Sequence, residues 1–210
     1  MPDPKAYSTI ARLYDLLDLP FEYWRYRPVR KILWRGLGGR ILDAGIGTGR
    51  NIPFYPAKAE MIGIDLSGAM LKRARMRQQQ FDASVQLHRG NICETSFEDQ
   101  SFDAIASSFL FCVLEDRLQL PALRELRRIL RPGGEIRILE YAYSQKPIRR
   151  VIMNLWAPWV QFAYGARFDR DTAQYASAAG LQVVEDRFLH ADIIKLLVLK
   201  PLPAGTGHQG

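Results

Sequence analysis

Short runs of apolar residues, each ended by glycine or a polar residue, alternate along the chain with segments of helical periodicity. The apolar runs cover 40–44, 61–65, 85–89, 103–107 and 134–140. Helices are expected at 28–35, near 49–55, at 67–81 and at 117–130. Strands that alternate with helices along the chain are typical of a parallel sheet covered on both faces. The pattern therefore predicts an α/β fold with a mostly parallel sheet.

Both ends of the chain depart from this alternation. Residues 8–18 place Ile10, Leu13 and Leu17 on one face of a predicted helix. Residues 181–189 and 193–199 are separated by three residues only, which predicts an antiparallel pair of strands. The polar, Gly- and Pro-containing tail 201–210 is expected to be disordered. We expect one domain over 1–200, made of N-terminal helices in 1–36 and a core in 37–200.

A glycine-rich turn after the first strand is the strongest functional signal. The sequence Asp-Ala-Gly-Ile-Gly-Thr-Gly occupies 43–49, and the second strand ends at Asp65. Glycine lets a backbone turn tightly against a ligand. A carboxylate at the tip of the neighbouring strand is placed to bind a ribose diol. The two features together predict a nucleoside-cofactor site.

The spacing Gly-x-Gly-x-Gly differs from the dinucleotide pattern Gly-x-Gly-x-x-Gly, and no Gly-x-x-x-x-Gly-Lys-Ser/Thr is present. Asp43 would repel a pyrophosphate but attract an ammonium group. On these residues the chain resembles the class I S-adenosylmethionine-dependent methyltransferases. Further resemblance at Gly90-Asn91-Ile92, 101–108 and 123–134 extends it over roughly 39–140.

The resemblance implies a single Rossmann-like domain whose seven-stranded sheet is mostly parallel, with an antiparallel last strand. It also implies the cofactor S-adenosyl-L-methionine, with Asp43 and the loop at the methionine part, Asp65 at the ribose, and Met70, Asn91 and Ile92 around the adenine. The expected cofactor-binding residues are Asp43, Gly45, Ile46, Gly47, Thr48, Gly49, Asp65, Leu66, Met70, Asn91, Ile92 and Ser107.

Other stretches bear on the methyl acceptor. Tyr14-Asp15 resembles the N-terminal lid element of lipid and quinone methyltransferases, and 49–56, 109–116 and Glu140-Tyr141 resemble bacterial phospholipid N-methyltransferases. The Arg-Asn motif usual after strand four in quinone C-methyltransferases is absent. We therefore expect an amine headgroup such as phosphatidylethanolamine as acceptor. The residues expected to act on it are Tyr14, Tyr26, Glu140 and Tyr141.

In such a reaction the amine must be neutral, although a free amine of pKa near 10 is mostly protonated at neutral pH. A desolvated pocket lowers that pKa, and Glu140 or a tyrosine oxygen is a candidate proton acceptor. Aromatic faces can hold the methylated cation, with Tyr7, Tyr14, Tyr26 and Tyr141 as candidates. Each tyrosine can equally serve packing, and Glu140 can equally cap a helix. The three histidines show no metal-ligand spacing.

Composition and net charge indicate where the protein acts and which kind of partner it binds. The 210 residues are 48% hydrophobic and 24% charged, as in globular proteins, and the formal net charge is +7. Two cysteines and an N-terminus without an apolar signal segment favour a cytoplasmic protein. A basic balance favours an anionic partner. The aromatic and basic residues expected at an anionic membrane surface are Trp24, Arg25, Arg27, Arg149, Arg150, Trp156 and Trp159.

Alternatives remain open at this point. The apolar segment 148–165 is too short and interrupted to span a bilayer, so it either roofs the acceptor pocket or enters the lipid interface at the inner face of the membrane. The acceptor can instead be a quinone or a small lipophilic thiol. RNA is a further candidate because cations and aromatics alternate in 21–35, although no recognised RNA-binding module is present. A non-catalytic cofactor-binding protein is the last alternative.

Overall fold

The computed structural model describes residues 26–151, 153–155 and 170–203. The predicted helix at 8–18, Tyr7, Tyr14, Trp24, Arg25, Trp156, Trp159 and residues 204–210 lie outside them. The strands are β1 (Arg40–Ala44), β2 (Glu60–Asp65), β3 (Val85–Arg89), β4 (Phe102–Ser108), β5 (Leu130–Tyr141), β6 (Leu181–His190) and β7 (Ile194–Pro201). The helices are α2 (Arg27–Trp34), α3 (Gly68–Gln80) and α4 (Asp116–Ile129), with 3₁₀ turns η2 (Ile52–Phe54), η3 (Thr172–Tyr175) and η4 (Ser177–Ala179).

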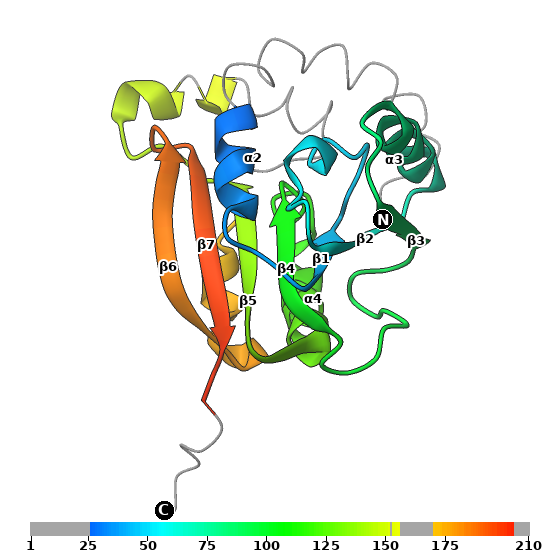
Figure 1. Ribbon diagram of the computed structural model, residues 1–210. Helices are drawn as coiled ribbons and strands as arrows, with labels where there is room; N and C mark the ends of the chain where they lie inside the picture. Colours follow the sequence, from blue (N-terminus) through cyan, green and yellow to red (C-terminus); the bar gives the residue numbers. More distant parts are fainter. Residues whose placement is uncertain (1–25, 152, 156–169, 204–210) are drawn as a thin grey trace, which may run out of the picture.

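All seven strands join one sheet in the order β3-β2-β1-β4-β5-β7-β6 (Figure 1). Strands β1 to β5 pair in parallel, and β7 pairs antiparallel with both β5 and β6. This confirms the predicted Rossmann-like α/β fold and its antiparallel last strand. The chain order reverses between β1 and β4. In open α/β sheets ligands bind outside the carboxyl ends of the strands at such a reversal.

One apolar cluster covers each face of the sheet. On one face Leu123 and Leu126 of α4 pack with Leu42 and Ile62 of the sheet. On the other face Val29, Leu33 and Trp34 of α2 pack with the sheet and with Ala74 of α3. Figure 1 shows α2 and α4 on opposite sides of the sheet. Both helices present one apolar stripe, which is why each covers a single face.

Three boundaries differ from the sequence prediction. The helix expected near 49–55 is only the 3₁₀ turn η2, because the backbone is already extended at Tyr55. Strand β5 begins at Leu130, and its pairing with β4 shifts register around Gly133, which has a φ of 82°. Strand β7 extends to Pro201, the first residue of the tail predicted to be disordered. Among the helices of the described ranges, none has the length and apolar content to cross a membrane.

Candidate cofactor and acceptor site

The glycine loop is fixed to the second strand and open on its outer side. The amides of Gly45 and Ile46 both donate to the carbonyl of Ile64, at 2.9 and 3.0 Å. Gly47 has a φ of 56°, and a Cβ added there would meet nothing closer than a backbone oxygen 4.0 Å away. At Gly49, by contrast, a Cβ would lie 2.7 Å from the Ile52 side chain. Gly49 is therefore needed for packing, whereas Gly47 keeps the backbone accessible to a ligand.

Asp65, the predicted ribose ligand, also holds the loop. Its Oδ2 accepts a hydrogen bond from the amide of Gly47 at 2.9 Å, and its Oδ1 accepts one from the amide of Ser67 at 2.8 Å. Ser67 in turn caps α3 by accepting from the Met70 amide. Burial raises the pKa of Asp65, although both amides lower it. The carboxylate thus joins the glycine loop to the start of α3.

Asp43 lies beneath the loop, fully buried. Its carboxylate accepts two bonds from the Asn51 amide nitrogen, at 3.0 and 3.1 Å, and one from the Tyr55 hydroxyl at 2.6 Å. Burial raises the pKa of Asp43 to about 6, although these bonds and the charge of Arg30 lower it. In this arrangement Asp43 shapes the loop from below, and its predicted contact with the methionine ammonium stays a prediction.

Arg30 of α2 completes this network. One guanidinium nitrogen donates to Asn51 Oδ1 at 2.7 Å and to Ser108 Oγ at 3.0 Å. The side chain is buried and lies over the ring of Phe109, 5.5 Å from its centroid. The network therefore links α2, the glycine loop and the end of β4, and it lies at the reversal of strand order between β1 and β4.

The remaining predicted cofactor residues divide into three whose side chains hold the loop and four that lie outside it. Ile46 packs against Gly63, Ser107 donates to the carbonyl of Ala44 at 2.9 Å, and Thr48 is held by Arg77. These three side chains support the loop from inside the protein. The other four are the exposed Leu66, the largely buried Met70 and Ile92, and Asn91, which accepts from the Cys93 amide.

Two of the predicted acceptor residues come together at the ends of α2 and β5. The hydroxyls of Tyr26 and Tyr141 share a hydrogen bond of 2.6 Å. The ring of Phe109 lies against both, with centroid distances of 5.4 Å to Tyr26 and 4.8 Å to Tyr141. Phe109 has a φ of 58°, a conformation that is rare for a bulky residue and is found at functional sites. We call Tyr26, Phe109 and Tyr141 the aromatic triad.

Glu140 does not join the aromatic triad. Successive residues of a strand point to opposite faces, and Glu140 lies among groups on the α4 side. It is fully buried, accepts from the Thr172 hydroxyl at 2.5 Å and forms an ion pair with Lys195 at 3.3 Å. Burial raises the pKa of Glu140, although Thr172 and Lys195 lower it. The geometry thus separates Glu140 from Tyr141 and Tyr26, with which it was predicted to act.

The sequence analysis missed Arg30, Asn51, Tyr55, Ser108 and Phe109 as parts of the site. One signal for Arg30 was available. In the predicted helix 28–35, Val29, Leu33 and Trp34 follow the spacing of a buried face, and Arg30 falls on that face. A cation on the buried side of a helix needs a polar partner, which here is the network beneath the glycine loop.

Comparison with known proteins agrees with the fold and the loop. A methyltransferase domain family matches residues 41–134. The chain is 30% identical over 178 residues, or 80% of its length, to a ubiquinone/menaquinone biosynthesis C-methyltransferase of Geobacter sp., of which 74% is covered. It is 32% identical over 117 residues to a phosphatidylethanolamine N-methyltransferase of Cereibacter sphaeroides, covering 54% of this chain and 57% of that protein. A S-adenosylmethionine-dependent methyltransferase of Aquifex aeolicus superposes with a TM-score of 0.65 at 20% identity, over 95% of this chain and 98% of that one.

The reversal of strand order, the open glycine loop and the strand-end carboxylate define a Rossmann-like nucleoside-cofactor enzyme. The chain belongs to the class I S-adenosylmethionine-dependent methyltransferases, as its sequence resemblance implies. Its cofactor is S-adenosylmethionine. The residues fit that group, because the outer side of the loop at Gly47 is open and Asp65 lies next to it.

Proposed function

We propose that this methyltransferase transfers methyl groups to the amine of a membrane phospholipid, such as phosphatidylethanolamine, at the inner face of the membrane. The observation that carries the proposal is the aromatic triad at the ligand edge of the sheet. Its three rings come from α2, the residue after β4 and the end of β5. Aromatic faces attract quaternary ammonium groups, which is the state that successive methylation of an amine produces.

For methyl transfer the protein mainly has to position the amine against the methyl group and to remove water from around it. Bound S-adenosylmethionine supplies an electrophilic methyl group, whose bond to sulfur breaks as the amine lone pair forms the new nitrogen–carbon bond. The phenol oxygens of Tyr26 and Tyr141 can accept hydrogen bonds from the amine N–H groups and so orient the lone pair. Loss of water around the bound amine lowers its pKa, and the released proton passes to solvent. Glu140 takes no part, because it faces the opposite side of the sheet.

A second feature supports placement at a membrane. Residues 147–151 and 153–155 are helical, and Ile148, Val151 and Leu155 are 80%, 58% and 76% exposed. The spacing i, i+3, i+7 puts these three apolar side chains on one face of the helix. Arg150 lies beside them, with its guanidinium 5.4 Å from the ring centroid of Tyr143. An exposed apolar stripe with adjacent cations is typical of helices that lie in the lipid interface. This favours the interface over a pocket roof for the described part of 148–165.

A quinone is the second candidate acceptor. The relative from Geobacter sp., covered over 74% of its length, is named for quinone biosynthesis. The aromatic triad would also stack on a quinone ring. A quinone, however, has no nitrogen that needs to be held as a cation, and Arg30 already occupies one face of Phe109. We prefer an amine acceptor because its N–H groups can donate hydrogen bonds to both phenol oxygens.

The test is methyl transfer from isotopically labelled S-adenosylmethionine in vesicles that contain phosphatidylethanolamine, phosphatidylglycerol and a demethylated quinone together. Mass spectrometry of the extracted lipids identifies the labelled product. Label on the headgroup nitrogen supports the proposal and counts the transfers, whereas label on the quinone alone refutes it. Tyr26→Phe and Tyr141→Phe should each lower turnover about tenfold by removing one phenol from the pair.

Membrane placement is tested separately by pelleting with the same vesicles. Ile148→Ser with Leu155→Ser should weaken pelleting and leave the affinity for S-adenosylmethionine unchanged. The matched control replaces two exposed apolar residues, Met76→Ser on α3 with Phe81→Ser at its C-cap, which are 63% and 48% exposed. Equal losses in both double variants would show that general surface hydrophobicity, and not the stripe on 147–155, brings the protein to the membrane.

A further inference from the structure

Two exposed cations lie four residues apart on α2, and a third follows at its C-cap. Arg27, Lys31 and Arg35 follow the spacing i, i+4, i+8, and all three are exposed. Like charges four residues apart destabilise a helix by a few tenths of a kcal/mol per pair. Within the described residues, Lys31 and Arg35 have no carboxylate partner. Helix stability therefore gives no reason for this stripe.

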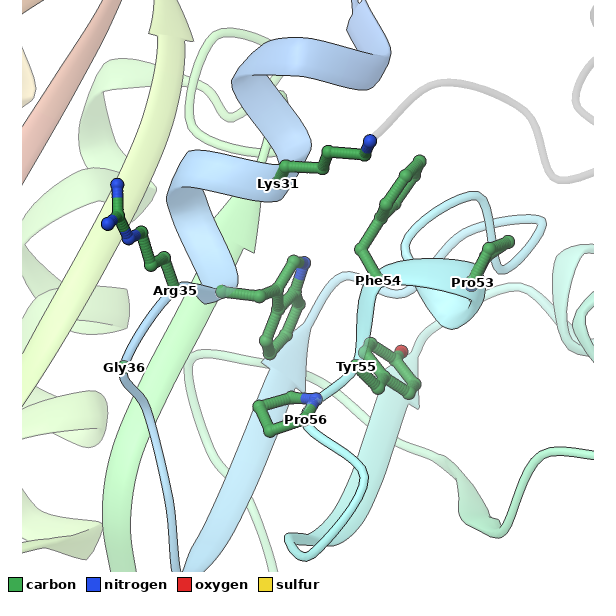
Figure 2. A pocket seen from close by; sticks show the side chains of 8 residues that line it. Lys31, Arg35, Gly36, Pro53, Phe54, Tyr55 and Pro56 are labelled. Carbon is green, nitrogen blue, oxygen red and sulfur yellow. The ribbon is translucent and has the colours of Figure 1, made fainter.

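A groove of about 500 Å³ runs between α2 and the 3₁₀ turn η2 (Figure 2). Figure 2 shows the Lys31 side chain extending toward Phe54, while Arg35 lies at the rim and points away from it. The groove is lined by Lys31, Trp34, Arg35, Gly36, Pro53, Phe54, Tyr55 and Pro56. Aromatic and proline rings thus form its walls, and Arg27 adds a cation 5.6 Å from the ring centroid of Phe54. In the part of the chain that the structure describes, no acidic side chain lines the groove.

Trp34 supplies a second, independent observation. Its side chain is fully buried against the ring of Tyr55, at a centroid distance of 4.8 Å, and its indole Nε1 has no hydrogen-bond partner among the described residues. A buried donor without an acceptor is costly, and such groups in native proteins ask for an explanation. The Nε1 atom is itself buried, but other atoms of Trp34 line the groove, so a small rotation of the ring on ligand binding would bring this N–H to an acceptor oxygen of the ligand.

We infer that the groove between α2 and η2 binds the phosphodiester of an anionic glycerophospholipid, a lipid that is held there and not methylated. Lys31 would pair with a phosphate oxygen, the Trp34 N–H would donate to a second oxygen, and the rings of Phe54 and Pro53 would contact the start of the acyl chains. A zwitterionic headgroup fits less well, because its ammonium group finds no carboxylate among the described residues of the lining. The inference rests on the proposed membrane placement and is independent of the identity of the methyl acceptor.

The first experiment measures binding to vesicles of phosphatidylcholine with and without phosphatidylglycerol. A cation close to an anionic surface contributes about 1 kcal/mol, so Lys31→Gln with Arg35→Gln should weaken binding roughly 10- to 30-fold. The matched control is Lys72→Gln with Arg75→Gln, which removes two exposed cations from α3 and should change binding less than threefold. Equal losses of vesicle binding in both double variants would show that binding depends only on net charge, and would overturn the inference.

The second variant, Trp34→Phe, removes the N–H at constant charge. We expect it to weaken binding to phosphatidylglycerol vesicles at least threefold, with thermal denaturation confirming that the variant is folded. Unchanged binding would overturn the role of the groove. Soluble glycerophosphoglycerol should compete with the vesicles at millimolar concentration, whereas inorganic phosphate should compete no better than chloride at equal ionic strength. Competition by phosphate alone would identify a free-anion site instead.

Two further measurements separate this inference from its alternatives. If the double variant at Lys31 and Arg35 loses affinity for an RNA oligonucleotide but not for vesicles, the groove is a nucleic-acid contact and the inference fails. Turnover is also measured on phosphatidylethanolamine in neutral detergent micelles, where the groove variants should match wild type. Absence of turnover there for wild type would refute the proposed acceptor, while groove-dependent vesicle binding would still stand.

Discussion

The buried carboxylate of Asp43 gives the sharpest test of the network beneath the glycine loop. Its pKa is raised from 3.8 to about 6, chiefly by burial. At 1.36 kcal/mol per pH unit, this interval corresponds to about 3 kcal/mol of stability that is present in acid and absent at neutral pH. The folded protein binds this proton more tightly than the unfolded chain does. Wild-type stability therefore falls as the pH rises through about 6.

The substitution Asp43→Asn removes the titration and keeps the size of the side chain. We would measure the free energy of unfolding in urea for both proteins between pH 5 and 7.5. Changes in hydrogen bonding to Asn51 and Tyr55 shift the two curves by a constant, so the informative quantity is the slope of their difference. That difference should move by roughly 1.4 kcal/mol across this range, in favour of the variant as the pH rises.

A control with the opposite behaviour is available in Asp103. Its pKa is lowered, first by the hydrogen bond from the Arg40 amide. Because both the folded and the unfolded pKa of Asp103 then lie at or below 3.8, the difference between wild type and Asp103→Asn should be flat above about pH 5. If the Asp43→Asn difference were equally flat, Asp43 would be ionised without penalty and the description of a desolvated network would be wrong.

Three further predictions concern the loop and its surroundings. Gly49→Ala should destabilise the protein by about 2 kcal/mol in urea unfolding, because its Cβ would lie 2.7 Å from Ile52. Gly47→Ala should destabilise it by about 1 kcal/mol only, yet weaken S-adenosylmethionine binding tenfold or more in calorimetry. A larger loss of cofactor affinity in Gly49→Ala than in Gly47→Ala would contradict the open side of the loop at Gly47. Asp65→Ala should abolish measurable cofactor binding and lower the free energy of unfolding by about 2 kcal/mol, because two backbone amides lose their acceptor. Full cofactor affinity in calorimetry would show that Asp65 does not bind the cofactor. Glu140→Gln should lower the free energy of unfolding by about 2 kcal/mol through the loss of its ion pair, while kcat changes less than threefold. A large fall in kcat with unchanged stability would show that Glu140 acts in catalysis.

The sequence predicted the sheet well because its strands are short segments that contain apolar residues and are bounded by glycine or polar turn residues. Strands β1 and β3 have the predicted bounds, β2 begins one residue earlier than predicted, and β4 is longer by one residue at each end. The turn η2 was overpredicted as a helix, since the pattern Asn-Ile-Pro-Phe looks like a helix start and only the extended backbone at Tyr55 ends it. Local sequence patterns therefore predict which helices and strands form, but they do not predict where a short turn ends.

The candidate site was only partly predictable. The glycine loop and Asp65 lie close in sequence and form a recognisable pattern, so their roles could be proposed from the chain alone. The link from Arg30 to Asn51 and Ser108 spans up to 78 residues, and only the fold brings these groups together. Likewise, the pairing of Tyr26 with Tyr141 spans 115 residues, and the side of the sheet that Glu140 faces depends on the register of β5.

The hydrogen bond from Arg30 to Asn51 has a consequence for building chimeras of this enzyme. The region that matches the methyltransferase family begins at residue 41, whereas Arg30 lies before it and supports the loop inside it. Exchanging the segment before residue 40 with that of a relative, as one would to transplant acceptor preference, would also remove the cation beneath the glycine loop. A chimera of this enzyme should therefore keep Arg30 whenever it keeps Asn51, or its cofactor affinity and its acceptor preference will change together.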